Sequence, residues 1–264
     1  MEGRKGLQPV IEILEVGGVV EPCMSPYNTP ILPVKKSDRM YRMVQDLREL
    51  NKIVEKRHPV VPNPYTIMGQ IPHAHKWFSV VDLKDAFWSC PLDEKSRDIF
   101  AFEWENPYTR RKQYRWKVLP QGLTESPNLF RQALEQVLEE YSSKQETQLL
   151  QYVDDLLLSS LDKTAVTRGT IELLNFLGER GLRVSKNKLQ FVEKEVKYLG
   201  HLVSEGKRRI NPERIEGITS LPLPRTIKEI GKFLGLIGYC RIWIENFASK
   251  TKFLYDKMAE KVKN

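Results

Sequence analysis

The chain of 264 residues is 41% hydrophobic and 29% charged, a composition that supports a sizeable core and excludes a disordered chain. Its three cysteines lack the spacing of a zinc knuckle or a disulfide framework, and no stretch approaches the roughly 20 apolar residues of a membrane span. The formal net charge is +8, and residues 206–264 hold 13 Lys and Arg against 6 Asp and Glu, which indicates either a polyanionic partner or a solvated helical surface.

The first predicted element is an amphipathic helix around residues 7–14, which ends at Gly17 and Gly18. Its apolar face holds Leu7, Val10, Ile11 and Leu14. A proline-rich extended stretch follows, and then two strands at 31–35 and 41–46 are predicted to form a hairpin with several basic side chains. Such charges are typical of a protected edge hairpin, and they are also suited to binding an anion.

Residues 77–87 combine an apolar strand that ends on Asp82 with a turn towards a short helix. Two further strands, 99–104 and 113–118, are predicted to pair antiparallel. A helix follows, for which Ser126 is the expected cap, with a proline at the first helical position. Its apolar stripe indicates a core helix that supports the neighbouring strands, and not a cofactor site.

The run at 149–158 places two adjacent acids, Asp154 and Asp155, inside an otherwise nearly apolar segment. Each flank is short, so we predict two buried strands joined by a tight turn at the acids. Aspartate favours turns, and for an arbitrary Asp-Asp pair a simple turn is the common explanation. Here, however, two buried strands deliver two like charges to one point. That is costly unless a cation neutralises them, and a divalent metal suits carboxylate oxygens.

A third carboxylate is available on the strand that ends at Asp82. If that strand lies beside the acidic hairpin, Asp82 faces Asp154 and Asp155. Three converging carboxylates can hold two divalent ions about 3.5–4 Å apart, an arrangement used for in-line phosphoryl displacement. The sequence therefore predicts a two-metal site for phosphoryl transfer.

The last third of the chain changes from strands to helices. After a packing helix at 171–177, short strands are predicted at 182–185 and 196–203. Three helices are expected to complete the chain, at 212–221, 226–239 and 249–261. Asn211 is the expected cap of the first of them.

Six blocks of the sequence, in order, resemble the retroviral reverse transcriptases, and most closely the gammaretroviral (murine leukaemia virus) type. The blocks are residues 22–30, 44–51, 81–87 (VDLKDAF), 119–122 (LPQG), 152–155 (YVDD) and 196–200. A Tyr-x-Asp-Asp motif alone is a weak signal. Six ordered blocks at compatible spacings, within a resemblance from about residue 7 to residue 255, are a strong one.

The resemblance implies an α+β fold of the right-hand polymerase type, with an antiparallel-sheet palm, mixed fingers and a helical thumb. The palm sheet is expected to carry two helices on one face. The implied boundaries are fingers at 1–57 and 90–124, palm at 58–89 and 125–205, and thumb at 206–264. The connection and RNase H domains that follow in the family are not expected in this sequence.

The resemblance also assigns a role to each matching position. It implies catalysis by Asp82, Asp154 and Asp155, with Leu83 beside them in a site for two Mg²⁺ ions, which Mn²⁺ can replace. The residues implied to bind the incoming dNTP are Lys36, Arg42, Asp85, Ala86, Phe87 and Gln121. The residues implied to contact primer or template are Tyr152, Val153, Tyr198, Leu199 and Gly200. Phe87 would crowd the sugar 2′ position and so favour deoxyribonucleotides, while its simpler explanation is core packing.

The implied reaction is primer extension with dNTPs on an RNA or DNA template, by a monomer without membrane contact, in the virion and the host-cell cytoplasm. The hairpin at 31–46 departs from the gammaretroviral pattern, because its loop is one residue shorter and Met43 stands where the family has proline. These departures leave open a second hypothesis, a catalytically silent nucleic-acid-binding retroviral relic. A third, an RNA-dependent RNA polymerase, is disfavoured by Phe87.

Overall fold

The computed structural model describes residues 2–35, 40–55, 63–106, 111–142 and 146–260. The chain divides into two compact units, Met1–Lys194 and Glu195–Asn264. Each unit contains its own β-sheet structure and its own helices. In the described part of the chain, no helix is both long enough and apolar enough to cross a membrane.

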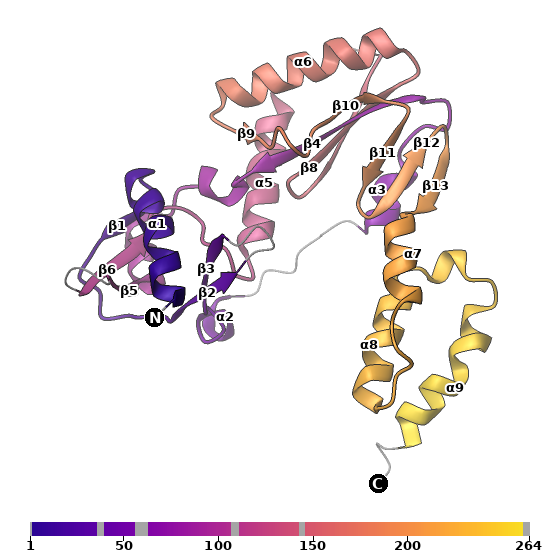
Figure 1. Cartoon of the computed structure of the whole chain (residues 1–264). Helices are drawn as coiled ribbons and strands as arrows, with labels where there is room; N and C mark the ends of the chain where they lie inside the picture. Colours follow the sequence, from indigo (N-terminus) through magenta and orange to yellow (C-terminus); the bar gives the residue numbers. More distant parts are fainter. Residues whose placement is uncertain (1, 36–39, 56–62, 107–110, 143–145, 261–264) are drawn as a thin grey trace. The chain divides into compact units, whose positions relative to one another are not determined.

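The first unit begins with helix α1 (Glu2–Val16), which lies against a three-stranded sheet and a separate hairpin (Figure 1). The antiparallel sheet has the order β1 (Val20–Pro22), β6 (Arg111–Trp116), β5 (Phe102–Glu105). The hairpin pairs β2 (Ile31–Lys35) with β3 (Tyr41–Gln45). Leu7, Ile11 and Leu14 of α1 are buried together with Met43 and the sheet's aromatic rings, so the predicted apolar face of the helix is confirmed.

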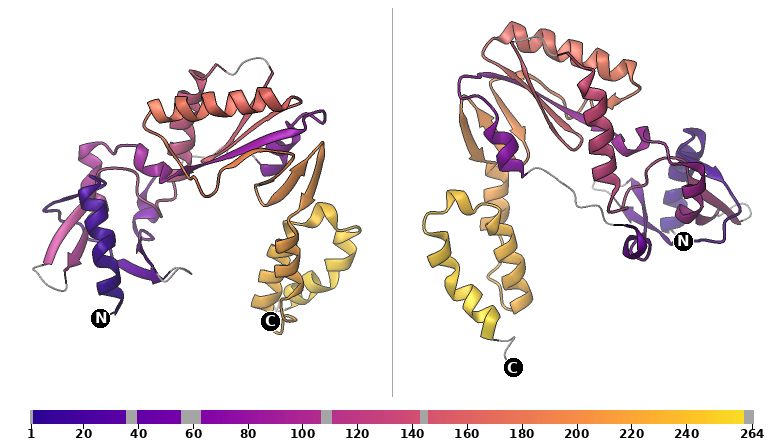
Figure 2. Two further views of the ribbon diagram at one scale, coloured as in Figure 1. Left: turned by 45° about the horizontal axis from the view of Figure 1, so that its top comes forward. Right: turned by 180° about the vertical axis from the view of Figure 1, so that it is seen from behind.

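The centre of the first unit is an antiparallel sheet in the order β10-β4-β8-β7, with β9 also paired to β4. Its strands are β4 (Trp77–Lys84), β7 (Gln148–Tyr152), β8 (Asp155–Ser160), β9 (Arg183–Val184) and β10 (Gln190–Glu193). Helices α5 (Ser126–Glu139) and α6 (Lys163–Glu179) lie against it (Figure 2). Short helical segments connect these parts: α2 (Leu50–Ile53), α3 (Pro64–Gly69), η1 (Ala86–Ser89), α4 (Glu94–Arg97) and η2 (Asp98–Phe100).

One buried cluster shows which face of the central sheet the two helices cover. It joins both helices to the sheet through Val81, Leu156, Phe130, Leu134, Leu173 and Leu177. Because side chains alternate along a strand, Asp82 and Asp155, each one position away from this cluster, share the opposite face. The expected antiparallel sheet with two helices on one face is confirmed.

The second unit is an antiparallel three-stranded sheet followed by helices (Figure 1). The elements are β11 (Glu195–Tyr198), β12 (His201–Ser204), β13 (Lys207–Ile210), α7 (Pro212–Thr219), α8 (Ile227–Gly238), η3 (Arg241–Trp243) and α9 (Phe247–Glu260). The Asn211 side chain accepts a hydrogen bond from the Glu213 amide, so the predicted cap of α7 is confirmed. Thr226 and Glu229 form a reciprocal capping box on α8.

Three local predictions differ from the structure. Ser126 is not a cap, because it is already the first residue of α5, and its hydroxyl donates to the Pro120 carbonyl at 2.9 Å. The predicted strand at 99–104 begins only at Phe102, after the turn of η2, since an apolar run alone does not distinguish a strand from a buried helical turn. The predicted strand at 196–203 is a hairpin. The fingers, palm and thumb boundaries stay a prediction.

Candidate active site

The acidic hairpin consists of β7 and β8, joined by a two-residue turn at Val153 and Asp154. Tyr152 pairs with Asp155 at the position that closes the turn. Val153 has a φ of 54°, a left-handed conformation that costs a β-branched residue about 1–3 kcal/mol. This strained turn places Asp154 at the corner and Asp155 at the start of a buried strand.

Strand β4 brings the third carboxylate to the hairpin. Asp82 pairs with Asp155 in the antiparallel register, and the Leu83 N–H donates to the Asp154 carbonyl at 3.2 Å. Asp82 and Asp155 share the sheet face opposite α5 and α6, with Asp154 at the adjoining turn. The structure thus brings together the three acids that the sequence analysis singled out.

Burial and like charge shift the pKa values of the two hairpin acids. The pKa of Asp155 is raised to about 6, first by burial and then by the negative charges of Asp154 and Asp82. Burial also raises the pKa of Asp154, an effect that a backbone hydrogen bond opposes and Asp82 reinforces. Both carboxylates are therefore held in an environment that disfavours their charged form, and a bound cation would relieve that cost.

Lys188 supplies a positive charge at these acids that the sequence analysis missed. Its Nζ atom lies 3.0 Å from Oδ2 of Asp82, and this hydrogen-bonded pair raises the pKa of Lys188. The loop that carries it is tied to β4, because the Ser185 N–H donates to the Asp82 carbonyl at 2.9 Å and the Lys188 N–H donates to the Ser185 carbonyl at 3.1 Å. No local signal marks this lysine, since its partner lies 106 positions earlier in the chain.

The three acids suit a divalent cation in donor chemistry, because carboxylate oxygens are the ligands that Mg²⁺ and Mn²⁺ prefer. As the side chains stand, no group of three or more His, Cys, Asp or Glu among the described residues is arranged as a ready set of metal ligands. One carboxylate oxygen of Asp82 is engaged by Lys188 instead. Holding a cation would therefore require the Asp82 side chain to exchange one positive partner for another.

A cavity of about 620 Å³ adjoins the acids through Lys188, which lines it. Arg42, Asp85 and Gln121, three of the residues predicted to bind dNTP, line the same cavity. They come from β3, from the end of β4 and from the loop before α5. Lys36, a further predicted dNTP contact, lies outside the described residues. The structure thus gathers polar side chains from distant segments around one hollow of nucleotide size.

The segment after Asp85 divides its side chains between two hydrophobic clusters. Ala86 is buried in the cluster under the central sheet, and Phe87 packs edge to face on Phe130 of α5, with ring centroids 5.8 Å apart. The next residue, Trp88, packs instead with the cluster around α1 and lies 6.4 Å from the Trp116 ring. Both residues predicted to bind dNTP here, Ala86 and Phe87, therefore also have packing roles.

The turn that carries Gln121 is held by Asn51 of α2. The Asn51 side-chain amide donates to the Gly122 carbonyl at 2.9 Å, and its oxygen accepts from the Thr124 N–H at 2.9 Å. Gly122 has a φ of 99°, which side-chain-bearing residues rarely adopt. Asn51 was not singled out in the sequence, although it closes one of the family-like blocks.

The residues predicted to contact primer or template fall in both units. Tyr152 and Val153 belong to the acidic hairpin, whereas Tyr198, Leu199 and Gly200 form a hairpin turn of the second unit. The Tyr198 ring is fully buried and serves the core of its own unit. Leu199 and Gly200 have φ of 47° and 77°, and the Tyr239 hydroxyl donates to the Leu199 carbonyl at 2.5 Å. The turn itself is thus the part that remains available for contact.

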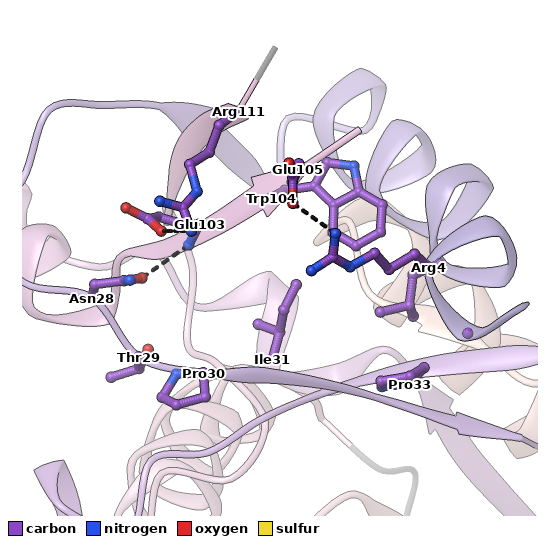
Figure 3. Close-up of a pocket in the computed structure, with 12 residues that line it drawn as sticks. Arg4, Asn28, Thr29, Pro30, Ile31, Pro33, Glu103, Trp104, Glu105 and Arg111 are labelled. Atoms are coloured by element: carbon purple, nitrogen blue, oxygen red, sulfur yellow. Dashed lines mark hydrogen bonds and ion pairs between the residues drawn. The ribbon is translucent and has the colours of Figure 1, made fainter. Parts of the chain in front are cut away.

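Another cavity, of about 640 Å³, is lined by residues of α1, β2, β5 and β6 (Figure 3). Its charged side chains pair with each other: Arg4 with Glu105 at 2.6 Å, and Arg111 with Glu103 at 3.2 Å. None of the predicted site residues lines it. Because its charges are compensated and no acid of the cluster reaches it, we assign it no catalytic role.

The sequence of the chain matches a known protein family and retroviral polyproteins. The family described as reverse transcriptase (RNA-dependent DNA polymerase) matches residues 34–203. The Gag-Pol polyprotein of Baboon endogenous virus (strain M7) is 47% identical over 259 residues, which are 97% of this chain and 15% of that protein. The Pol polyprotein of Feline endogenous virus ECE1 is 47% identical over 258 residues, which are 96% of this chain and 25% of that protein. The chain therefore spans a quarter or less of the length of these relatives.

Solved structures agree with the sequence match. The foamy viral protease-reverse transcriptase dRH in complex with double-stranded DNA superposes with a TM-score of 0.86 at 32% identity, over 97% of this chain and 43% of that chain. The foamy viral protease-reverse transcriptase in complex with an RNA/DNA hybrid gives 0.84 at 31% identity, over 98% of this chain and 34% of that chain. With the family match over more than half of its length, the chain belongs to the reverse transcriptase family and is of retroviral type.

Proposed function

We propose that this chain extends the 3′ end of a primer with dNTPs on an RNA or DNA template. The observation that carries the proposal is the register that sets Asp82 opposite Asp155, with Asp154 at the adjoining turn, in a chain of the reverse transcriptase family. Two of these acids are kept at a cost in burial, which is typical of functional carboxylates. Membership of the family supplies the class of reaction.

Asp82, Asp154 and Asp155 would hold two Mg²⁺ ions, or Mn²⁺ in their place, next to the main chain of Leu83. Bound there, the metal pair would lower the pKa of the primer 3′-hydroxyl and would neutralise charge on the triphosphate. The chain's own part is to hold the carboxylates on paired strands, whose hydrogen bonds fix the distances between their backbones. The helices on the far face keep those strands from shifting.

The cavity beside the acids would take the incoming dNTP. The Arg42 guanidinium can donate to phosphate oxygens from the cavity wall. Lys36, which lies outside the described residues, is the second predicted cation. The backbone N–H groups of Asp85 and Ala86 would face the phosphates, while Gln121 and Phe87 would lie against the sugar. The half-buried ring of Phe87 packs on Phe130 and would leave no room for a 2′-hydroxyl on the sugar.

Template and primer would be held mainly through phosphates. The related foamy viral structures contain double-stranded DNA in one case and an RNA/DNA hybrid in another, and we propose the same classes of duplex for this chain. The excess of basic residues at 206–264 suits contact with a phosphate backbone. Tyr152, Val153 and the turn at Leu199 and Gly200 would contact the primer end. We propose a monomer that acts in the virion and the host-cell cytoplasm.

The test is extension of a DNA primer on an RNA template with Mg²⁺. Asp154→Asn and Asp155→Asn should each lower the extension rate by more than about 100-fold, while template–primer binding stays within about twofold. Glu179→Gln, on the exposed end of α6, is the matched loss of one acid and should keep the wild-type rate. Undiminished extension by Asp154→Asn would overturn the mechanism.

The same assay separates the alternatives. Wild-type protein that binds template–primer but extends it with neither Mg²⁺ nor Mn²⁺ would be a catalytically silent binding protein. Preferential use of NTPs over dNTPs would make it an RNA polymerase.

A further inference from the structure

Lys188 is the positive partner of an acid that the proposed reaction needs for its metal. The Lys188 Nζ atom contacts Asp82 Oδ2 at 3.0 Å, and its charge also acts on Asp154 and Asp155. The three carboxylates are not arranged as a ready ligand set while this contact is made, as far as the described residues show. The ion pair and the divalent metal therefore make competing demands on the same carboxylate.

We propose that Lys188 is a built-in counter-ion that occupies the place of a cation on Asp82 and is displaced when a divalent metal binds. The inference rests on the proposed function, because it assumes that the metal binds at these acids. It adds a step that the function alone does not require: metal binding exchanges one positive charge for another, so the affinity of the free protein for metal is lowered by its own lysine.

The exposure of the two side chains favours this exchange. The Lys188 side chain is 67% exposed, whereas that of Asp82 is 19% exposed. The ammonium can therefore return to water at little cost, while the carboxylate remains where the strand holds it. Exposed ion pairs of this kind are weak, so a divalent ion that gains several carboxylate oxygens can displace the lysine.

The backbone of the lysine is fixed, so the exchange needs only a side-chain rotation. The Ser185 N–H donates to the Asp82 carbonyl, and β9 and β10 on either side of the loop both pair with β4. Lys188 also lines the 620 Å³ cavity, whose wall includes Asp85 and Gln121, so the ammonium has open space to enter when it leaves Asp82. After loss of the metal, the Lys188 ammonium can return to Asp82, because the lysine backbone stays beside β4.

The test measures Mn²⁺ binding by the electron paramagnetic resonance signal of free Mn²⁺. It uses the full chain without nucleotide or nucleic acid, near 0.15 M salt, where distant charges are screened. Lys188→Met removes the competitor and should bind Mn²⁺ about threefold more tightly or better. Lys188→Arg keeps the charge and, because a guanidinium can donate two hydrogen bonds to one carboxylate, should bind Mn²⁺ no more tightly than wild type. Lys186→Met, an exposed lysine two positions away, controls for net charge and should change affinity by less than about 1.5-fold.

Two further variants separate this inference from the proposed function. Asp82→Asn and Asp154→Asn should weaken Mn²⁺ binding by about tenfold or more. If they do, but Lys188→Met binds like wild type or more weakly, only the counter-ion role is overturned. It is also overturned if Lys186→Met gains as much affinity as Lys188→Met. If neither acid variant changes binding, the proposed metal site fails and the counter-ion role fails with it. If neither wild type nor Lys188→Met binds Mn²⁺, the counter-ion role is overturned, and primer extension with Mg²⁺ decides the metal-dependent function. Circular dichroism of each variant verifies that it is folded.

Discussion

Asp82 is the direct cross-strand partner of Asp155 on two buried antiparallel strands. Like charges in this position oppose one another, and the strands around them offer little water to reduce the effect. The pair is therefore a source of instability in the protein without metal, and a source of affinity for a cation.

The stability of the metal-free protein should depend on the ionisation of Asp155. Its pKa is raised from 3.8 to about 6, so the folded protein holds the proton more tightly than the unfolded chain does. The stabilising contribution is complete below pH 3.8 and is lost as the pH rises through 6. In EDTA, Asp155→Asn should exceed wild type in unfolding free energy by about 1–2 kcal/mol at pH 7, after a reduction for partial exposure, and by less at pH 4.5.

Urea unfolding at both pH values measures this difference. Addition of Mg²⁺ at pH 7 is the control, because it should stabilise wild type more than Asp155→Asn. A difference between the two proteins that does not change with pH would contradict the assignment.

Phe87 should control the choice between deoxyribonucleotides and ribonucleotides. Phe87→Val removes the ring that packs on Phe130 and opens space on that side of the site. We expect the efficiency ratio of ATP to dATP to rise about tenfold, as kcat/KM values on one template–primer will report. Phe176→Val, which removes a ring packed on Tyr141 in the same unit, should lower stability without changing the ratio. An equal change of the ratio in both variants would indicate a general loss of packing and would contradict a specific role for Phe87.

Asn51 should position Gln121 through the turn that follows it. Asn51→Ala removes the two hydrogen bonds to Gly122 and Thr124, and should cost about 1 kcal/mol of stability. The KM for dNTP should rise about three- to tenfold, while the Kd for template–primer stays within about twofold. Lys52→Ala, which loses only an exposed ion pair with Glu49, should change neither constant. A KM unaltered in Asn51→Ala would remove this positioning role.

Gly200 should be intolerant of a side chain. It has a φ of 77°, and a Cβ there would lie 3.1 Å from the Tyr239 hydroxyl and 3.3 Å from an Arg214 nitrogen. Gly200→Ala should lower the unfolding free energy by about 1–2 kcal/mol. Gly217→Ala is the matched opposite, because it lies inside α7 with nothing near its Cβ, and it should stabilise by about 0.5–1 kcal/mol. Thermal unfolding of both variants tests the pair, and equal signs would contradict the prediction.

Binding of duplex nucleic acid should depend steeply on salt. Residues 206–264 carry an excess of seven positive charges, and phosphate contacts release counter-ions. A plot of log Kd against log salt concentration, measured by fluorescence anisotropy with two unrelated duplex sequences, should have the same positive slope for both. A flat plot, or strongly different affinities for the two sequences, would point to recognition through the bases.

The parts of the site that the sequence predicts are those on regular strands. Asp82 and Asp155 follow from apolar runs that end on acids, because burial and alternation are local properties. The cap at Asn211 follows from the next two residues in the chain. The Phe87 packing partner, by contrast, depends on which face α5 covers, which the pattern of one helix does not determine.

The parts that the sequence does not predict depend on contacts between distant segments. Lys188 meets Asp82 only because the loop between β9 and β10 folds back onto β4. Asn51 reaches the Gly122 turn across more than 70 positions of sequence. Serine is a residue type that often caps helices, yet the Ser126 hydroxyl donates its hydrogen bond to the Pro120 carbonyl. In each case a polar side chain has several possible partners, and tertiary packing selects one.

The neighbouring rings of Phe87 and Trp88 belong to different hydrophobic clusters, one under the central sheet and one around α1. The 3₁₀ turn η1 thus connects two hydrophobic clusters of the first unit. Because the two rings are neighbours in the chain, a shift of one cluster would displace the backbone of the residue that packs in the other. A ligand that draws the α1 side inwards would therefore displace the backbone a few residues after Asp82, so an event at the 620 Å³ cavity would reach the acids through the chain as well as through charge.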